Sequence, residues 1–169
     1  IAHATKAAMG ENYPDSAVDD VLFWMESKGR LGRKAKAGFF SYDAQGKRLG
    51  YWEGLNAQYP LTAQQPDLID VQHRLIFVQS LEAVRALEEG VLMDIREGDV
   101  GAILGWGFAP WSGGPFSWFD ILGSPYAAER CNQLHHAYGD RFACPDLLRS
   151  MASKGQSFYG QAKKAQSAA

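Results

Sequence analysis

The chain has 169 residues, of which 46% are hydrophobic and 21% charged, and its formal net charge is −2. This balance is typical of a soluble globular protein, and a chain of this length buries about two thirds of its unfolded surface. The weak charge gives no reason to expect nucleic-acid or anionic-membrane binding, and no apolar run approaches the ~20 residues that span a bilayer. The start at Ile1, without a signal-peptide pattern, suggests a piece of a longer protein. The two cysteines, Cys131 and Cys144, are too few for a disulfide framework and favour a reducing, cytoplasmic location.

The first third of the chain begins with two predicted helices. Residues 2–9 form the first, which Gly10 ends, and a helix that begins after Ser16 and ends at Gly29 forms the second. Residues 29–52 are rich in Gly, Lys and Arg, and the pattern FFSYD–AQGK–RLGYW predicts a small hairpin within residues 38–52. Residues 55–65 have the character of a linker.

The strongest predicted helix covers residues 67–89 and ends at Gly90. Its apolar residues recur at helical spacing and form one broad face: Leu68, Val71, Leu75, Val78, Leu81, Val84 and Leu87. No long alternating run indicates an extensive sheet, so the fold class expected is all-α.

Three further helices are predicted towards the C-terminus. Asp94 with Glu97 begins a helix over residues 95–104, in the manner of a capping box. Ser124 and the proline after it begin a helix that reaches Tyr138 and stops at the following glycine. The last helix covers residues 145–154. No strand–GxGxxG–helix pattern of a dinucleotide site occurs.

A weak internal repeat divides the chain. Met25–Gly29 reads MESKG and Met151–Gly155 reads MASKG, and each copy follows a Pro-Asp pair and precedes an aromatic pair. A five-residue match can arise by chance, but three features in the same order favour duplication. The domains expected are therefore the end of a first helical copy (1–54), a linker (55–65), a second copy (66–160) and a disordered tail (161–169).

The densest aromatic segment is 105–123, GWGFAPWSGGPFSWFDILG, with six aromatic residues between Trp106 and Phe119. It could form a pocket wall or a partner-docking surface. The alternative is an aromatic plug where helices meet, which we favour because aromatic clusters more often belong to a core.

At this segment the chain resembles the C-terminal helical domain of the 3-hydroxyacyl-CoA dehydrogenases. The preceding RLIFVQSLEAVRALEEGVLMDIREGDVGAILGWGF is similar to the long helix and the next helix of that domain, and RFACPDLLRSMASKGQSFY is similar to its end. GRLGRKAKAGFFSYD resembles the tail of a preceding copy. The multifunctional fatty-acid β-oxidation proteins carry two such copies after a Rossmann domain, in agreement with the repeat.

The resemblance implies a parent enzyme that oxidises (S)-3-hydroxyacyl-CoA with NAD. In that family the catalytic His–Glu pair and the NAD site lie in the Rossmann domain, so we assign no catalytic, cofactor-binding or metal-binding residue to this chain. We expect the chain alone to be inactive and to supply substrate cover and a domain or dimer interface. The partners implied are the parent's Rossmann and hydratase domains, a thiolase subunit, the acyl-CoA substrate and a second copy.

One basic cluster stands out, and it consists of Lys28, Arg30, Arg33, Lys34, Lys36, Lys47 and Arg48. It could attract the phosphates of a CoA thioester, dock against another domain, or form an ordinary solvated loop. Arg33 and Lys34 coincide with the GRK of the tail motif, which makes them the candidate substrate-binding residues.

Two other groups of residues invite a functional interpretation. His73 lies on the long helix, and we expect it to be bonded to a neighbour rather than catalytic. Cys131, His135, His136 and Cys144 could offer metal ligands, but their spacing matches no standard zinc pattern. Burial of the cysteines as small apolar residues is the simpler expectation.

Overall fold

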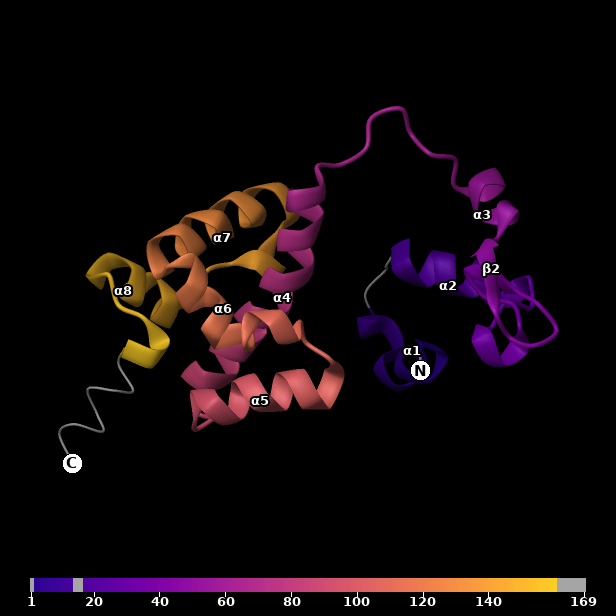
Figure 1. The fold of residues 1–169 in the computed structure, drawn as a ribbon. Helices are drawn as coiled ribbons and strands as arrows, with labels where there is room; N and C mark the ends of the chain where they lie inside the picture. Colours follow the sequence, from indigo (N-terminus) through magenta and orange to yellow (C-terminus); the bar gives the residue numbers. More distant parts are fainter. Residues whose placement is uncertain (1, 14–16, 161–169) are drawn as a thin grey trace. The chain divides into compact units, whose positions relative to one another are not determined.

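The computed structural model describes residues 2–13 and 17–160, and it divides the chain into two compact units, Ile1–Gln65 and Pro66–Ala169 (Figure 1). The predicted all-α class with a small hairpin is confirmed. The predicted Ser16 cap and the tail over 161–169 lie outside the described residues. None of the helices in the described ranges combines the length and the apolar character that crossing a bilayer requires.

The first unit contains short helices and one antiparallel strand pair. Its elements are α1 (Ala2–Met9), η1 (Gly10–Asn12), α2 (Ala17–Ser27), η2 (Arg33–Ala35), β1 (Phe40–Tyr42), β2 (Arg48–Tyr51) and α3 (Glu53–Gln58). The strands pair Phe40 with Tyr51 and Tyr42 with Arg48, with a bulge between Ser41 and Tyr42. Because α3 extends to Gln58, the first four positions of the segment expected as a linker are helical.

Arg30 organises this small unit. Its Nε donates to the carbonyl of Gly38 at 2.7 Å, and one Nη donates to the carbonyl of Phe40 at 3.1 Å. The guanidinium also lies over the ring of Trp52, 4.3 Å from the ring centroid. The Arg30 guanidinium therefore makes its hydrogen bonds and its cation–π contact within the unit. These contacts connect the end of α2 to the hairpin and to the start of α3.

The second unit is entirely helical over its described residues. Its elements are α4 (Leu68–Glu88), α5 (Ile95–Trp106), η3 (Pro110–Ser112), α6 (Pro115–Leu122), α7 (Ser124–Tyr138), η4 (Asp140–Phe142) and α8 (Asp146–Lys154). The carboxylates of Asp67 and Asp94 cap α4 and α5 by accepting from the backbone N–H of Asp70 and Arg96. Ser124 begins α7 as predicted, but its hydroxyl donates to the carbonyl of Gln156 and not to the helix start.

The core of this unit lies where α4 packs on α6 and α7 packs on α8. The predicted aromatic plug is confirmed for the side chains that α6 contributes, although a helix at this position was not predicted. Trp106 and Trp111 of the same segment are exposed. The buried members of the core are Phe77, Leu81, Val84, Phe116, Trp118, Phe119, Ala127, Cys131, Leu134, Phe142, Cys144, Leu148, Met151 and Phe158.

The broad apolar face predicted for α4 divides into two in the structure. Leu81 and Val84 lie in the core together with Phe77. Leu68 and Leu75 do not, since they are 68% and 61% exposed. Residues 77, 81 and 84 and residues 68, 71, 75 and 78 fall on different sides of a helix with 3.6 residues per turn. Within the described part of the second unit, Leu68 and Leu75 remain uncovered, whereas Val78 is partly buried and packs against the core.

A buried carboxylate joins three parts of the second unit. Asp99 on α5 is 2% exposed, and it accepts from the backbone N–H of Phe116 at 2.8 Å and of Ser117 at 3.1 Å. It also accepts from the hydroxyls of Ser117 and Tyr159, at 2.6 and 2.9 Å. These bonds satisfy the free N–H groups at the start of α6 and fix the end of the described chain.

Gly114 lacks a side chain and therefore allows the Asp99 carboxylate to lie close to the start of α6. Its φ is +116°, and a Cβ built there would lie 2.5 Å from the side chain of Asp99. A second carboxylate, Asp120 on α6, accepts from the backbone N–H of Phe158 at 2.7 Å and of Tyr159 at 2.9 Å. Asp99 and Asp120 thus both accept hydrogen bonds from the aromatic pair Phe158-Tyr159, which follows the MASKG segment.

The two repeat segments end their helices with the same hydrogen bonds. The N–H of Arg30 donates to the carbonyl of Met25 at 3.0 Å, and the N–H of Gln156 donates to that of Met151 at 2.9 Å. The glycines before them, Gly29 and Gly155, have φ of +68° and +60°. Both ends are therefore Schellman motifs, in which a glycine adopts the left-handed conformation.

Replacing the Asp99 carboxylate should destabilise the second unit. We expect Asp99→Asn to lower the free energy of unfolding by roughly 3 kcal/mol, because an amide cannot accept from all four donors. Guanidinium titration followed by far-UV circular dichroism measures this loss. Asp140→Ala is the matched control, since the side chain of Asp140 is 100% exposed, and it should change little. Equal effects of the two substitutions would contradict the assigned role.

Candidate functional site

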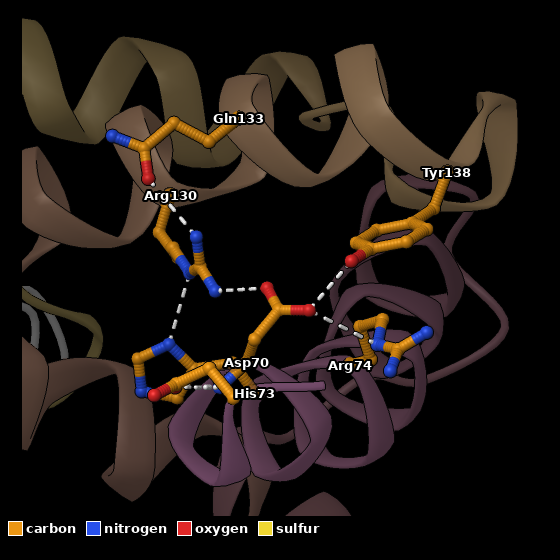
Figure 2. A network of polar contacts seen from close by, with 7 residues as sticks. Asp70, His73, Arg74, Arg130, Gln133 and Tyr138 are labelled. Atoms are coloured by element: carbon orange, nitrogen blue, oxygen red, sulfur yellow. Dashed lines mark hydrogen bonds and ion pairs between the residues drawn. The ribbon is translucent and has the colours of Figure 1, made fainter. Parts of the chain in front are cut away.

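A network of polar side chains links α4 to α7 (Figure 2). The Asp70 carboxylate accepts from Arg130 Nη2 at 2.7 Å and from the Tyr138 hydroxyl at 2.6 Å. Arg74, one turn further along α4, forms an ion pair with the same carboxylate, with 3.4 Å between Nε and Oδ2. Asp70 thereby joins Arg74 of α4 to Arg130 and Tyr138 of α7.

The surroundings of Asp70 favour its charged form. The hydrogen bond from Tyr138 lowers the pKa of the Asp70 carboxyl, and the bond and charge of Arg130 lower it further, against the opposing effect of burial. The pKa of the Tyr138 hydroxyl is raised, because that hydroxyl donates to the carboxylate. The pair therefore exists as carboxylate and neutral phenol at neutral pH, which is an arrangement that holds two helices together.

His73 belongs to the same network. Arg130 Nε donates to His73 Nδ1 at 3.0 Å, and the imidazole lies against the ring of Phe77. Since a guanidinium can only donate, Nδ1 accepts, and the neutral ring carries its proton on Nε2. Burial lowers the pKa of His73, and the charge of Arg130 lowers it further. The expected bond to a neighbour is present, and the neighbour is an arginine.

An open groove of about 470 Å³ lies beside this network. Apolar side chains from α4 and η4 form most of its lining, and arginines and a tyrosine form the rest; the residues are Val71, Arg74, Leu75, Val78, Tyr138, Arg141 and Phe142. A second groove of about 440 Å³ is lined by Val78, Gln79, Glu82, Ala83, Ala86 and Trp106. Both surfaces suit an occupant that is apolar in part.

A third, basic pocket of about 410 Å³ lies in the first unit, where it is lined by Arg33, Tyr42, Gly46, Lys47 and Arg48. Of the two residues predicted to contact substrate, Arg33 lines this pocket and Lys34 does not. Lys47 and Arg48 enter it because the hairpin register places Arg48 opposite Tyr42. The sequence pattern that predicted the hairpin also indicated this pocket. A hairpin brings Lys47 and Arg48, at the end of the basic cluster, close to Arg33 near its beginning.

The cysteines of the second unit are buried next to one another. A hydrogen bond with Cys144 and burial both raise the pKa of the Cys131 thiol, and the same bond lowers the pKa of Cys144. His135 pairs with Asp140 at 3.0 Å. Within residues 2–13 and 17–160, no three His, Cys, Asp or Glu side chains gather as ligands of a metal ion would.

The depressed pKa of His73 predicts an acid-sensitive fold. The unfolded chain takes up a proton at His73 near pH 6.5, and the folded chain takes it up only at lower pH. The contribution of His73 to the free energy of unfolding is therefore complete above about pH 6.5, and it decreases as the pH falls towards the pKa of His73 in the folded chain. Urea titrations at pH 7.5 and 5.5 should show a smaller loss for His73→Gln than for the native chain. An unchanged loss would show that other groups cause the acid sensitivity.

Comparison with known proteins identifies relatives of this chain. No protein-family model matches the chain. It is 38% identical over 152 residues to the fatty acid oxidation complex subunit alpha of Shewanella loihica and 36% identical over 157 residues to that of Vibrio vulnificus. These alignments cover 89% and 90% of the chain but 21% of each relative, so the chain spans about a fifth of their length. The chain is thus homologous to a C-terminal domain of the multifunctional fatty acid oxidation complex alpha subunit.

Proposed function

We propose that this chain is the C-terminal helical part of an NAD-dependent 3-hydroxyacyl-CoA dehydrogenase of fatty-acid β-oxidation, acting in the cytoplasm. Its role there is to cover the acyl-CoA substrate and to form interfaces with the Rossmann and hydratase domains of the parent, a thiolase subunit and a second copy. The observation that carries this proposal is the 35–38% identity to alpha subunits across nearly nine tenths of the chain.

An internal duplication is part of the same proposal. We propose that residues 1–54 are the end of one helical copy and residues 66–160 a second copy. In support, α2 and α8 end with equivalent hydrogen bonds around Gly29 and Gly155, and Met25 and Met151 are both buried. A shared five-residue string alone would not require equivalent backbone geometry.

The described residues do not fit NAD. Dinucleotide sites place a glycine-rich turn between a parallel strand and a helix, so that the helix start faces the pyrophosphate. The strands within the described ranges are the antiparallel pair β1 and β2, and α3 follows β2 without such a turn. We therefore derive no hydride-transfer step from this chain, and the proposal assigns that chemistry to the Rossmann domain.

An absorbance assay tests this division of labour. The purified chain, mixed with NADH and acetoacetyl-CoA, should oxidise no NADH above the rate without protein. Addition of a separately produced Rossmann domain from an alpha subunit is the positive control for the assay. Robust turnover by the chain alone would refute the proposed role.

A second candidate role is direct binding of CoA, which the basic pocket of the first unit favours. Arg33, Lys47 and Arg48 surround one cavity, and Arg48 also lies over the ring of Phe40, 4.6 Å from the centroid. Guanidinium groups bind phosphate through paired hydrogen bonds, and ammonium groups attract it as point charges. The 3′-phosphate and pyrophosphate of CoA are the anions that this pocket would hold.

Calorimetry with free CoA tests this role and uses the structure for its control. Arg33→Glu and Lys47→Glu should each weaken binding about tenfold, the effect of losing roughly 1.4 kcal/mol of charged contact. Lys34→Glu changes the net charge equally outside the pocket and should weaken binding far less. An absence of binding heat, or equal losses for all three variants, would remove this candidate.

A further inference from the structure

The two cysteines of the chain form a buried pair to which the proposed roles give no function. Cys131 lies on α7 and Cys144 lies in the segment between η4 and α8, and the two helices pack against each other (Figure 1). Both side chains belong to the core of the second unit, where Cys131 is 0% and Cys144 is 7% exposed. The sequence contains no third cysteine. The fold therefore brings together the two thiols that the chain has.

The two thiols are in direct contact. The Cys131 thiol donates a hydrogen bond to the sulfur of Cys144. A cysteine that only fills space in a core behaves as a small apolar residue and needs no such partner. A disulfide requires neighbouring backbones and side chains that converge. The thiol–thiol hydrogen bond shows that these two side chains converge.

The position of Cys144 allows the sulfurs to approach further, to the about 2 Å of a disulfide bond. Helical hydrogen bonds of α7 fix the backbone of Cys131, whereas Cys144 lies outside any helix, just before α8. A shift of this irregular segment brings the sulfurs together with both helices in place. Cys144 is also nearer to the surface, because Asp146, two residues further on, is exposed. A small oxidant therefore reaches Cys144 before it reaches Cys131.

The surroundings of Cys144 favour its thiolate, which is the nucleophilic form of cysteine. The hydrogen bond from Cys131 lowers the pKa of the Cys144 thiol, and the charge of Arg149 lowers it further. Burial and the carboxylates of Glu88 and Asp146 oppose this effect. An Nη of Arg149 also donates to the carbonyl of Cys144 at 2.8 Å, which fixes the cation beside this residue. The pKa of Cys131 is raised, because its thiol donates to Cys144 and is buried.

We propose that Cys131 and Cys144 form a peroxide-sensitive dithiol, which hydrogen peroxide converts reversibly into an intramolecular disulfide. The Cys144 thiolate attacks the peroxide first: an S–O bond forms, the O–O bond breaks, and the departing hydroxide takes up a proton and becomes water. The sulfur of Cys131 then attacks the sulfenic acid of Cys144 and gives its proton to the departing oxygen. The S–S bond forms, the S–O bond breaks, and a second water leaves. Two thiols are oxidised and one peroxide is reduced, and a small thiol reverses the change by exchange.

Peroxide treatment of the full 169-residue chain tests the proposal without any substitution. After treatment and alkylation in denaturant, mass spectrometry should show a monomer that has lost two hydrogen atoms and carries no alkyl group. Dithiothreitol should restore both alkylation sites. Because the sequence has two cysteines, a disulfide within one monomer can join only these residues. Unreacted thiols, sulfinic acid in place of a disulfide, or disulfides exclusively between chains would overturn the proposal.

Variants test the order of the two steps. Cys131→Ala should leave Cys144 as a sulfenic acid that dimedone traps, whereas Cys144→Ala should leave Cys131 unreactive under the same conditions. Arg149→Gln should slow the peroxide reaction roughly threefold at neutral pH, because the thiolate fraction of Cys144 falls. Arg96→Gln is the matched control, since it removes the same charge from α5, where Arg96 pairs with Asp94. Preferential dimedone labelling of Cys131, or equal slowing by the two arginine variants, would refute the assigned order.

The disulfide should also stabilise the second unit. It joins residues that are 13 positions apart and so restricts the unfolded chain. The thermal midpoint of the oxidised chain should lie about 5 °C above that of the reduced chain, as measured by differential scanning fluorimetry with and without dithiothreitol. Cys131→Ala should show no such response to peroxide. A midpoint that oxidation lowers or leaves unchanged would contradict the fit of the disulfide to the fold. Because no assay involves dehydrogenase activity, this inference can fail while the proposed function stands.

Discussion

The second unit depends on one buried acid more than on any other polar group. Asp99 accepts four hydrogen bonds that come from α6 and from Tyr159, and it does so in an apolar surrounding. A carboxylate in such a place is stable only when its oxygens are fully satisfied. The positions of its hydrogen-bond partners are therefore constrained as well. The helix α6 must begin at Pro115, and Gly114 must lack a side chain. The chain must also return to α5 after α8, so that Tyr159 reaches the carboxylate. Much of the aromatic core around α6 is positioned by this single constraint.

Helix boundaries were largely predictable, because they depend on local chemistry. Asp67, Asp94 and Gly155 act through neighbours within a few residues, so a short string of sequence suffices to find them. The start of α6 was not predictable in this way, since its capping group is Asp99, which lies 17 residues before the Phe116 N–H that it accepts from. The glycines and prolines around α6 do not by themselves indicate a helix start, and the tertiary contact with Asp99 shows where the helix begins. The helix α3 was also missed, because it has no side-chain cap and lies in a segment of mixed composition.

The side chains around the candidate sites were harder to predict than the helices. Periodicity placed Leu68, Leu75, Leu81 and Val84 on one broad face, but it carries no information on which part of that face a neighbour covers. In the basic cluster, Arg30 resembles its neighbours in sequence, yet it is bonded to backbone carbonyls inside the unit. Arg33 and Lys34 are adjacent, and only Arg33 lines the pocket. In an irregular segment, the direction of a side chain follows from backbone turns, which composition does not specify.

The bonds from Asp99 and Asp120 to the last described residues also have a consequence for synthesis. Phe158 and Tyr159 lie 38 and 39 residues beyond the carboxylate that accepts from their N–H groups, and Tyr159 lies 60 residues beyond Asp99. A ribosome produces the chain from its N-terminus, so α4, α5 and α6 exist for some time before their final partners do. During that interval the aromatic side chains of α6 have only part of their covering. The second unit therefore completes these contacts only after Tyr159 has emerged from the ribosome.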